Sequence, residues 1–232
     1  MVLLFALMLG TAAPAAPVLQ HETASVAVQT LDGRADRIAD LIVAKQVAEA
    51  TALVDPLLEE FEKANAGEKR RIYCAADAAE SRRYMAKVRA EKPASPAVVI
   101  GKGWCVALWA KGYLLDDAGQ PAAAIPYLVR AAAMRPDHRQ YWAELTFAYQ
   151  ATKAWPEMLD AGRQAAALAA EADEPDRTTS LCKAWHSMAY AQIELGHWDD
   201  ATELLNKCLA LDPGYEKAKT ELEYIARSRP KT

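Results

Sequence analysis

Residues Cys182 to Tyr215, CKAWHSMAYAQIELGHWDDATELLNKCLALDPGY, form the stretch that decides the fold of this chain. Lys183 to Leu195 has the apolar spacing of one amphipathic helix, and Gly196 ends it, because glycine takes a positive φ at little cost. Asp199 to Leu211 has the pattern of a second helix that packs back on the first. Pro213 closes the unit, since proline donates no backbone hydrogen bond. A single hairpin cannot bury its own apolar face, so we expect further copies.

Two further copies precede this stretch. Aligning Trp142 with Trp185 defines one at residues 139–172, and aligning Pro136 with Pro213 defines another at residues 105–138. The two abut at a period of about 34 residues, and the pattern resembles the tetratricopeptide repeat. In the last copy the resemblance is carried by Trp185, Ala189, Gly196, Ala201, Cys208 and Pro213. It implies an all-α fold, a right-handed superhelical α-solenoid of antiparallel helix hairpins.

The resemblance covers a little over half of the chain and gives it an expected organisation. Residues 173–181 are additional to the repeats, and we expect a longer second helix and an acidic loop there. Residues 68–90 are predicted to form one long helix, with the first helix of the first repeat starting near Val98. The expected segments are a signal peptide at 1–17, a flexible leader at 18–33, a degenerate helical region at 34–96, and a repeat domain at 97–232 with repeats at 105–138, 139–172 and 182–215 and a capping helix at 216–229.

The N-terminal residues Met1 to Pro17 look like a secretory signal peptide. An apolar run from Val2 to Leu9 is followed by small residues and by Ala13-Pro14-Ala15, which is typical of a cleavage site. The run is too short for a membrane span, which needs about 20 residues. We therefore expect a bacterial protein that is periplasmic or secreted, without stable membrane insertion once this segment is removed. The segment has no Lys or Arg before its apolar run, which is unusual for a signal peptide. The alternative interpretation is a buried N-terminal helix.

The composition narrows the classes of function. The chain has 232 residues, of which 52% are hydrophobic and 25% charged, as in a soluble globular protein. Its net charge is −4, and acidic and basic residues are mixed along its length. Because no basic stripe is present, nucleic acid is not expected as a partner. The chain has ten glycines and no strand-like alternation of β-branched residues, which favours helices throughout.

The four cysteines leave two interpretations open. Cys182 and Cys208 could form a disulfide across the last hairpin, as exported proteins permit. Packed helices, however, seldom bring two Cα atoms within the roughly 7 Å that a disulfide requires, so we favour small, buried, free cysteines. Cys74 and Cys105 could pair only if the elements that carry them are neighbours.

No pattern of catalytic or metal-binding residues stands out. Cys182 and His186 are spaced i and i+4, but two ligands do not make a metal site, and no motif supplies others. The Gly101-Lys-Gly103-Trp cluster lacks the pattern of a phosphate-binding loop, so a kink at a helix start explains it better. We therefore predict that the chain is no enzyme and needs no cofactor or metal.

The resemblance implies instead a concave surface, lined by the first helix of each hairpin, that binds a peptide or a partner domain. Counting nine residues into each unit gives an aromatic residue every time, and we predict that these rings form a ladder along that surface. The alternative is that they only fill space between helices. Lys and Asn, which the family uses to bind chaperone C-termini, are absent from the corresponding positions. The predicted groove residues are Trp109, Tyr113, Gln140, Phe147, Gln150, Lys183, His186, Tyr190 and Tyr224.

The predicted function is thus that of an interaction scaffold of the bacterial cell envelope with a protein or peptide partner. The second candidate is a non-catalytic accessory protein of an envelope enzyme, which would bind a small ligand or a glycan in the same groove.

Overall fold

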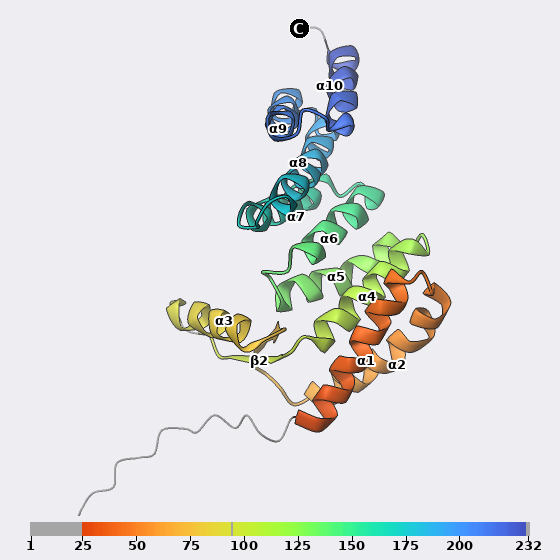
Figure 1. Cartoon of the computed structure of the whole chain (residues 1–232), viewed down its shortest axis with the longest axis vertical. Coiled ribbons are helices and arrows are strands. Elements are labelled where there is room, and N and C mark those ends of the chain that lie inside the picture. The colour runs from red at the N-terminus through yellow and green to blue at the C-terminus, as the bar shows by residue number, and fades with distance from the viewer. Residues whose placement is uncertain (1–24, 94, 231–232) are drawn as a thin grey trace, which may run out of the picture.

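The computed structural model describes residues 25–93 and 95–230, and most of these belong to helices that stack along one axis (Figure 1). The elements, in chain order, are α1 (Ser25–Val43), α2 (Val47–Asn65), β1 (Arg71–Ala75), α3 (Ala78–Ala90), β2 (Ala97–Gly101), α4 (Gly103–Asp117), α5 (Pro121–Met134), α6 (Arg139–Thr152), α7 (Trp155–Ala170), α8 (Asp176–Glu194), α9 (Trp198–Leu211) and α10 (Glu216–Ser228).

Consecutive helices pair as hairpins, and each hairpin packs on the next. The pairs α4 and α5, α6 and α7, and α8 and α9 are in contact, and α10 packs on α9 and α8 at the end of the stack. A residue with positive φ lies just beyond the first helix of every hairpin, where it reverses the chain. These residues are Lys45, Gly119, Lys153 and Gly196. The predicted solenoid of hairpins with a C-terminal capping helix is therefore confirmed.

The stack begins earlier than the sequence indicated. Helix α1 starts at Ser25, inside the segment expected to be a flexible leader, and α1 and α2 form a hairpin that packs directly on α4. Ala35 and Ile38 of α1 and Val54 and Leu57 of α2 are buried in the core, which is why this hairpin is ordered. The expected signal peptide and the leader before Ser25 lie outside the described residues.

A small βαβ unit interrupts the hairpins between α2 and α4. Strands β1 and β2 pair in parallel, with Tyr73 opposite Val99, and α3 makes the crossover between them (Figure 1). The predicted long helix over 68–90 is therefore wrong in its first part, and the first repeat helix starts at Gly103 rather than near Val98. Apart from Arg71, both strands are short apolar runs, and such runs cannot be told from buried helix by periodicity alone.

The residues between the second and third predicted repeats lengthen α8 rather than α7. Helix α8 has 19 residues and α7 has 16, and the turn between them runs from Glu171 to Pro175. The acidic loop expected there is present. The additional helical residues lie mostly at the start of α8 and not at the end of α7, where they were expected.

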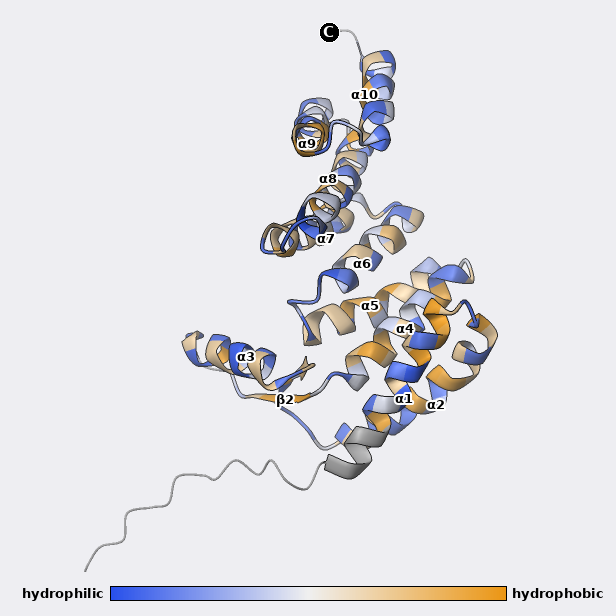
Figure 2. Ribbon diagram, in the orientation of Figure 1, coloured by the Kyte–Doolittle hydropathy of each residue, from blue (hydrophilic) through white to orange (hydrophobic). Residues whose placement is uncertain are grey.

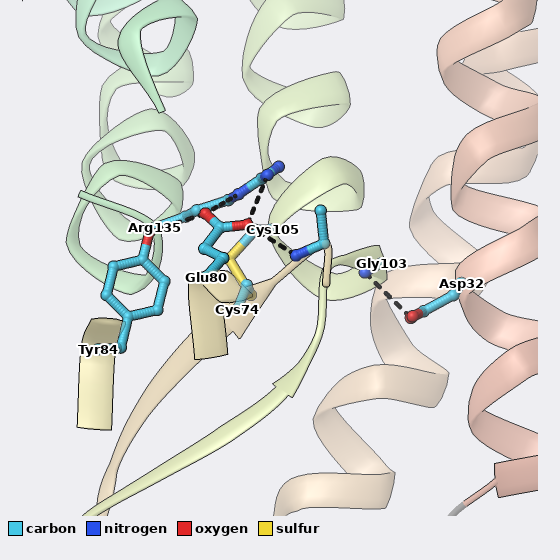
Figure 3. The surroundings of a disulfide bond; sticks show 8 residues. Asp32, Cys74, Glu80, Tyr84, Gly103, Cys105 and Arg135 are labelled. Carbon is cyan, nitrogen blue, oxygen red and sulfur yellow. Dashed lines mark hydrogen bonds and ion pairs between the residues drawn. A yellow bond between two sulfur atoms is a disulfide. The ribbon is translucent and has the colours of Figure 1, made fainter. Parts of the chain in front are cut away.

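Both pairs of cysteines form disulfides, contrary to the interpretation favoured from the sequence. The Cα atoms of Cys182 and Cys208 are 4.8 Å apart, because the two positions face each other in the buried contact between α8 and α9. The Cα atoms of Cys74 and Cys105 are 6.2 Å apart, and their bond ties β1 to the first turns of α4 (Figure 3). Small buried residues such as Ala201 and Ala189 let α8 and α9 approach more closely than the usual spacing of helix axes, on which the expectation of free cysteines depended.

The βαβ unit is also held by a buried ion pair. Arg135, which follows α5, donates two hydrogen bonds of 2.8 and 2.9 Å to the carboxylate of Glu80 on α3 (Figure 3). The hydroxyl of Tyr84 and the backbone N–H of Ala76 donate to the same carboxylate. Together with the disulfide, these contacts fix the unit against the helical stack.

Gly101 at the end of β2 and Gly103 at the start of α4 permit a close approach of α1. The Asp32 carboxylate accepts a 3.0 Å hydrogen bond from the backbone N–H of Gly103, so it satisfies a free donor at the start of α4 (Figure 3). A Cβ atom at Gly103 would lie 2.2 Å from this carboxylate, and one at Gly101 would lie 2.0 Å from it. A helix does start at this glycine cluster, as predicted, and the glycines make room for the side chain of Asp32.

The apolar core has two main parts along the stack. The larger one extends from α1 to α7 and includes Leu57, Trp104, Leu128 and Tyr141. A smaller one fills the last hairpin and its cap. Figure 2 shows the difference: apolar residues are prominent on α4 and α5, whereas α10 is mostly hydrophilic. Among the described residues, no helix has both the length and the apolar character needed to cross a membrane.

Candidate functional site

The first helices of the repeats line one face of the stack. Helix α6 contacts both α4 and α8, and α8 contacts α10, so these four helices follow one another as a continuous surface. All nine predicted groove residues lie on them. Their side chains differ in how far they are exposed to a partner.

Phe147 on α6 and Tyr224 on α10 are the most available aromatic side chains. Phe147 is 55% exposed and Tyr224 is 44% exposed. Residues next to them in sequence, Thr146 and Ile225, are buried, so each ring projects from a well-packed helix. Large apolar side chains held in this way on a rigid element are typical of binding surfaces.

The other two members of the predicted ladder are half-buried. The ring of Tyr113 lies against Trp109, with centroids 5.8 Å apart, and the ring of Tyr190 lies against Trp155 of α7, with centroids 5.9 Å apart. Within residues 25–93 and 95–230, the ring contacts do not join the four ladder residues to one another. The aromatic residues therefore line the face singly, and two of them also contribute to packing.

Trp109, Gln140 and Glu144 come together where α4 and α6 meet. Trp109 is only 7% exposed, and its indole N–H has no hydrogen-bond partner within the described chain. The Gln140 amide donates a long hydrogen bond, 3.4 Å, to the Glu144 carboxylate. Burial raises the pKa of Glu144, and the nearby charge of Asp116 raises it further, although Gln140 and Trp109 oppose the shift. The pKa of Asp116 is itself raised, first by burial and then by Asp117.

His186 occupies the corresponding place between α8 and α10. Its Nε2 atom is 3.7 Å from the Glu221 carboxylate, and its ring meets Tyr215 edge-on at 6.2 Å. Burial and the charge of Lys217 lower the pKa of His186, and burial raises the pKa of Glu221. A shallow hollow that is open to solvent, with a volume of about 350 Å³, is lined here by His186, Glu216, Lys217, Thr220 and Glu221.

The remaining predicted residues flank the face. Lys183 at the start of the repeat-like part of α8 is exposed, and Gln150 near the end of α6 is half-buried. Neither makes a side-chain hydrogen bond or ion pair within the described residues. In the same part of the chain, no three His, Cys, Asp or Glu side chains are gathered as a metal ion would require.

Two acidic residues of this face, Glu144 and Glu221, are not among the predicted groove residues. Glu144 precedes Phe147 by three residues, and Glu221 precedes Tyr224 by three, so each carboxylate shares a helix face with an exposed ring. This repeated spacing could have identified them.

Two segments of the chain match models of a known repeat family. A family model described as tetratricopeptide repeat matches residues 182–223, and a second model with the same description matches residues 106–138. Among curated protein sequences, none matches this chain. The expected repeat at 139–172 stays a prediction, although α6 and α7 occupy these residues.

Solved structures of the same kind are similar to the chain at low identity. The second tetratricopeptide domain of the human RPAP3 protein, solved with an HSP70 peptide, is 23% identical over 53% of this chain and 96% of that one, with a TM-score of 0.47. A Podospora anserina putative kinesin light chain is 17% identical over 85% and 93%, with a TM-score of 0.48. YrrB, described as a tetratricopeptide protein with an unusual peptide-binding site, is 17% identical over 82% and 90%, with a TM-score of 0.45.

The fold, with the two family matches, defines an α-solenoid that contains tetratricopeptide repeats. The βαβ unit between α2 and α4 is an addition to this architecture, held in place by the Cys74–Cys105 disulfide and the Glu80–Arg135 ion pair.

Proposed function

We propose that this protein is a non-catalytic interaction scaffold of the bacterial cell envelope that binds a peptide or a partner domain along α4, α6, α8 and α10. The observation that carries the proposal is the exposure of Phe147 and Tyr224 on this face, 55% and 44% respectively. Such rings contribute strongly to binding, because they bury a large area and lose little side-chain entropy. The family resemblance supports the same face as the binding surface.

Two observations support an exported protein. Residues 1–17 have the pattern of a secretory signal peptide. All four cysteines are bonded in pairs, and disulfides form and persist in oxidising compartments such as the bacterial periplasm. The mature chain should accordingly begin close to Ala16, and the intact mass of protein from a periplasmic fraction tests this.

The test of the binding face is capture of partners from a periplasmic extract with the mature protein as bait. The Phe147→Ala/Tyr224→Ala variant removes the two exposed rings of the face. The matched control is Val129→Ala/Leu211→Ala, which removes two side chains on second helices that are 42% and 47% exposed. We expect a reproducible partner to be lost with the first variant and kept with the control.

Stability is measured on the same samples. Because Phe147 and Tyr224 are exposed, their removal should change the free energy of unfolding by less than about 1 kcal/mol. Equal capture by both variants would refute the proposed face. A loss of about 3 kcal/mol or more with Phe147→Ala would instead show that the ring is part of the core.

The open hollow at His186 favours a second candidate, a ligand- or glycan-binding accessory protein. Its lining of His, Glu, Lys and Thr side chains suits a polar ligand. A rise in Tm with added oligosaccharides that disappears in Thr220→Val, combined with no protein partner, would favour this candidate over the scaffold.

A further inference from the structure

We propose that β2 accepts an extended, acidic segment of a partner protein as an additional strand at the edge of the βαβ unit. The predicted groove lies on α4, α6, α8 and α10, whereas this surface belongs to α3 and β2. It is therefore a second binding site with a different chemistry, and it does not depend on the proposed function.

The first observation is a free strand edge. Within the described part of the chain β2 pairs with β1 alone, and Ala97 lies opposite Arg71. The backbone N–H of Arg71 donates a 3.0 Å hydrogen bond to the C=O of Pro96, so the ladder uses the backbone groups of every second residue from there on. The N–H and C=O groups of Ala97 and Val99 therefore point away from β1. Across residues 25–93 and 95–230, no other element forms a hydrogen bond to them.

The two edges of the sheet differ in how they are covered. Strand β1 contacts α4 and α5 and is buried from Tyr73 to Ala75. Every residue of β2 is instead partly exposed, and α1 approaches it at Gly101, its last residue. Proteins usually protect an exposed edge with charged residues or proline, and the strand Ala97–Gly101 has neither. Such an edge offers main-chain hydrogen bonds to an extended peptide.

The second observation is the charge of the unit, which lies to one side of the helical stack (Figure 1). Residues 68–102 contain nine of the chain's 27 Lys and Arg residues but only four of its 31 Asp and Glu residues. The unit is therefore basic, whereas the rest of the chain is acidic. Pairing of two copies through their β2 edges would bring two basic units together, and like charges repel. An acidic segment is attracted instead, so charge favours a different protein over a second copy.

Two arginines of α3 lie beside the free edge. Glu80 and Lys87 mark one side of this helix, because both pair with residues that follow α5, and β1 contacts α5 as well. Arg82 and Arg89 lie two turns apart on the opposite side of the helix, which is the side of β2. Both are exposed, and neither forms an ion pair with any residue that the structure describes. Carboxylates on a strand added to β2 would have these two guanidinium groups as partners.

The test of the charge preference uses a short fluorescent peptide in which Val and Glu alternate, with binding to the mature protein measured by anisotropy. A matched peptide has Lys in place of Glu. We expect the Glu peptide to bind about tenfold more tightly than the Lys peptide, and Arg82→Glu/Arg89→Glu to remove this difference. The control is Arg163→Glu/Lys207→Glu, which makes the same change of charge on exposed positions of α7 and α9 and should bind like the wild type.

A second variant tests the backbone of the edge. Val99→Pro removes an N–H that points away from β1, so it blocks an added strand without removing a hydrogen bond of the ladder. Val99→Ala shortens the same side chain and keeps the N–H, and is the matched control. We expect Val99→Pro to weaken binding of the Glu peptide about tenfold or more and Val99→Ala to bind like the wild type. The Tm of each variant shows whether it is folded.

Methylation of the peptide tests strand addition without any change to the protein. Successive residues of a strand direct their backbone groups to opposite sides, so an added strand uses alternate amides to pair with β2. One peptide is methylated on the amide nitrogens of its Val residues and the other on those of its Glu residues. We expect one of the two to lose binding and the other to keep it.

Several outcomes would overturn the inference. Equal effects of the two methylation patterns would refute strand addition, and equal binding of the Glu and Lys peptides would refute the preference for acidic segments. No binding of the Glu peptide at millimolar concentration would refute both. A dimer of the free protein that Val99→Pro abolishes would show that a second copy occupies the edge. If Phe147→Ala/Tyr224→Ala loses the peptide, the peptide occupies the groove, which refutes the second site but leaves the proposed function intact.

Discussion

The carboxylate of Glu80 accepts the hydrogen bonds that hold the βαβ unit against the helical stack. It is 5% exposed and accepts hydrogen bonds from Arg135, Tyr84 and the backbone of Ala76. Burial alone would raise its pKa, but these donors, Arg135 above all, outweigh burial and lower the pKa from the ordinary 4.5 to about 2. The carboxylate is therefore stabilised in its charged form in the folded protein.

This shift predicts how acid acts on the protein. Because the pKa is lower in the folded state, the unfolded chain binds the proton first as the pH falls, and folding loses stability between about pH 4.5 and pH 2. The loss should amount to roughly 3 kcal/mol. Glu80→Gln should be less stable than the wild type by about that amount at pH 7, and the two should converge towards pH 2. Urea denaturation at a series of pH values measures the difference.

His138 also contributes to the loss of stability in acid, because burial and the charge of Arg135 lower its pKa to about 4. The charge of Glu80 opposes this shift, so His138 weakens the Glu80→Gln variant more than the wild type, and the convergence due to Glu80 is measured below about pH 4. A difference between the two proteins that is constant from pH 7 to pH 2 would mean that Glu80 is not held ionised by Arg135.

At the scale of the elements, the end of each first helix depends on one residue with positive φ. Gly196 has φ 78° and no atom within 4 Å of an added Cβ, so a substitution there meets no steric clash and is penalised by the backbone alone. Lys153 has φ 58° at the equivalent place after α6. A non-glycine residue in this conformation is strained by about 1–2 kcal/mol.

The two positions therefore predict opposite effects. Gly196→Ala should destabilise the protein by about 1 kcal/mol, whereas Lys153→Gly should stabilise it by roughly 0.5–1 kcal/mol after the extra entropy of the unfolded chain is subtracted. Thermal unfolding of both variants measures the pair. Effects of the same sign would show that the turns are not the limiting feature of these hairpins.

Some of these elements could be predicted from the sequence and others could not. The hairpins after Gly103 were predictable because Trp185, Gly196 and Ala201 recur in phase, and a repeat supplies several independent copies of one signal. The strands were missed because the four apolar residues that follow Arg71 in β1 fit a buried helix as well as a strand. The Cys182–Cys208 bond was missed because general helix spacing does not describe a contact between small residues. Within the groove, the rings followed from the repeat, but the burial of Glu144 depends on the neighbouring repeat and could not.

At the scale of the whole molecule, a solenoid is stabilised mainly by contacts between neighbouring hairpins, so its parts can differ in stability. The larger apolar cluster extends from α1 to α7 and includes the Cys74–Cys105 bond. The smaller cluster of the last hairpin and α10 has far fewer buried residues, and it contains Cys182 and Cys208. The C-terminal end should therefore depend on its disulfide more than the N-terminal end does.

We therefore predict that loss of the Cys182–Cys208 disulfide loosens the C-terminal end of the stack and leaves the rest folded. Cys182 and Cys208 are 26 residues apart, and a bond across such a loop stabilises a protein by roughly 3–4 kcal/mol through the unfolded state. In the Cys182→Ala/Cys208→Ala variant, amide hydrogen exchange should accelerate in α8, α9 and α10, with little change in α4 and α5. The Cys74→Ala/Cys105→Ala variant is the control, and its faster exchange should be confined to β1, α3 and β2, because the large core still holds α4. If instead removal of the Cys182–Cys208 bond accelerates exchange equally along the whole stack, the solenoid unfolds as one cooperative unit, and its groove cannot loosen at one end while the other stays folded.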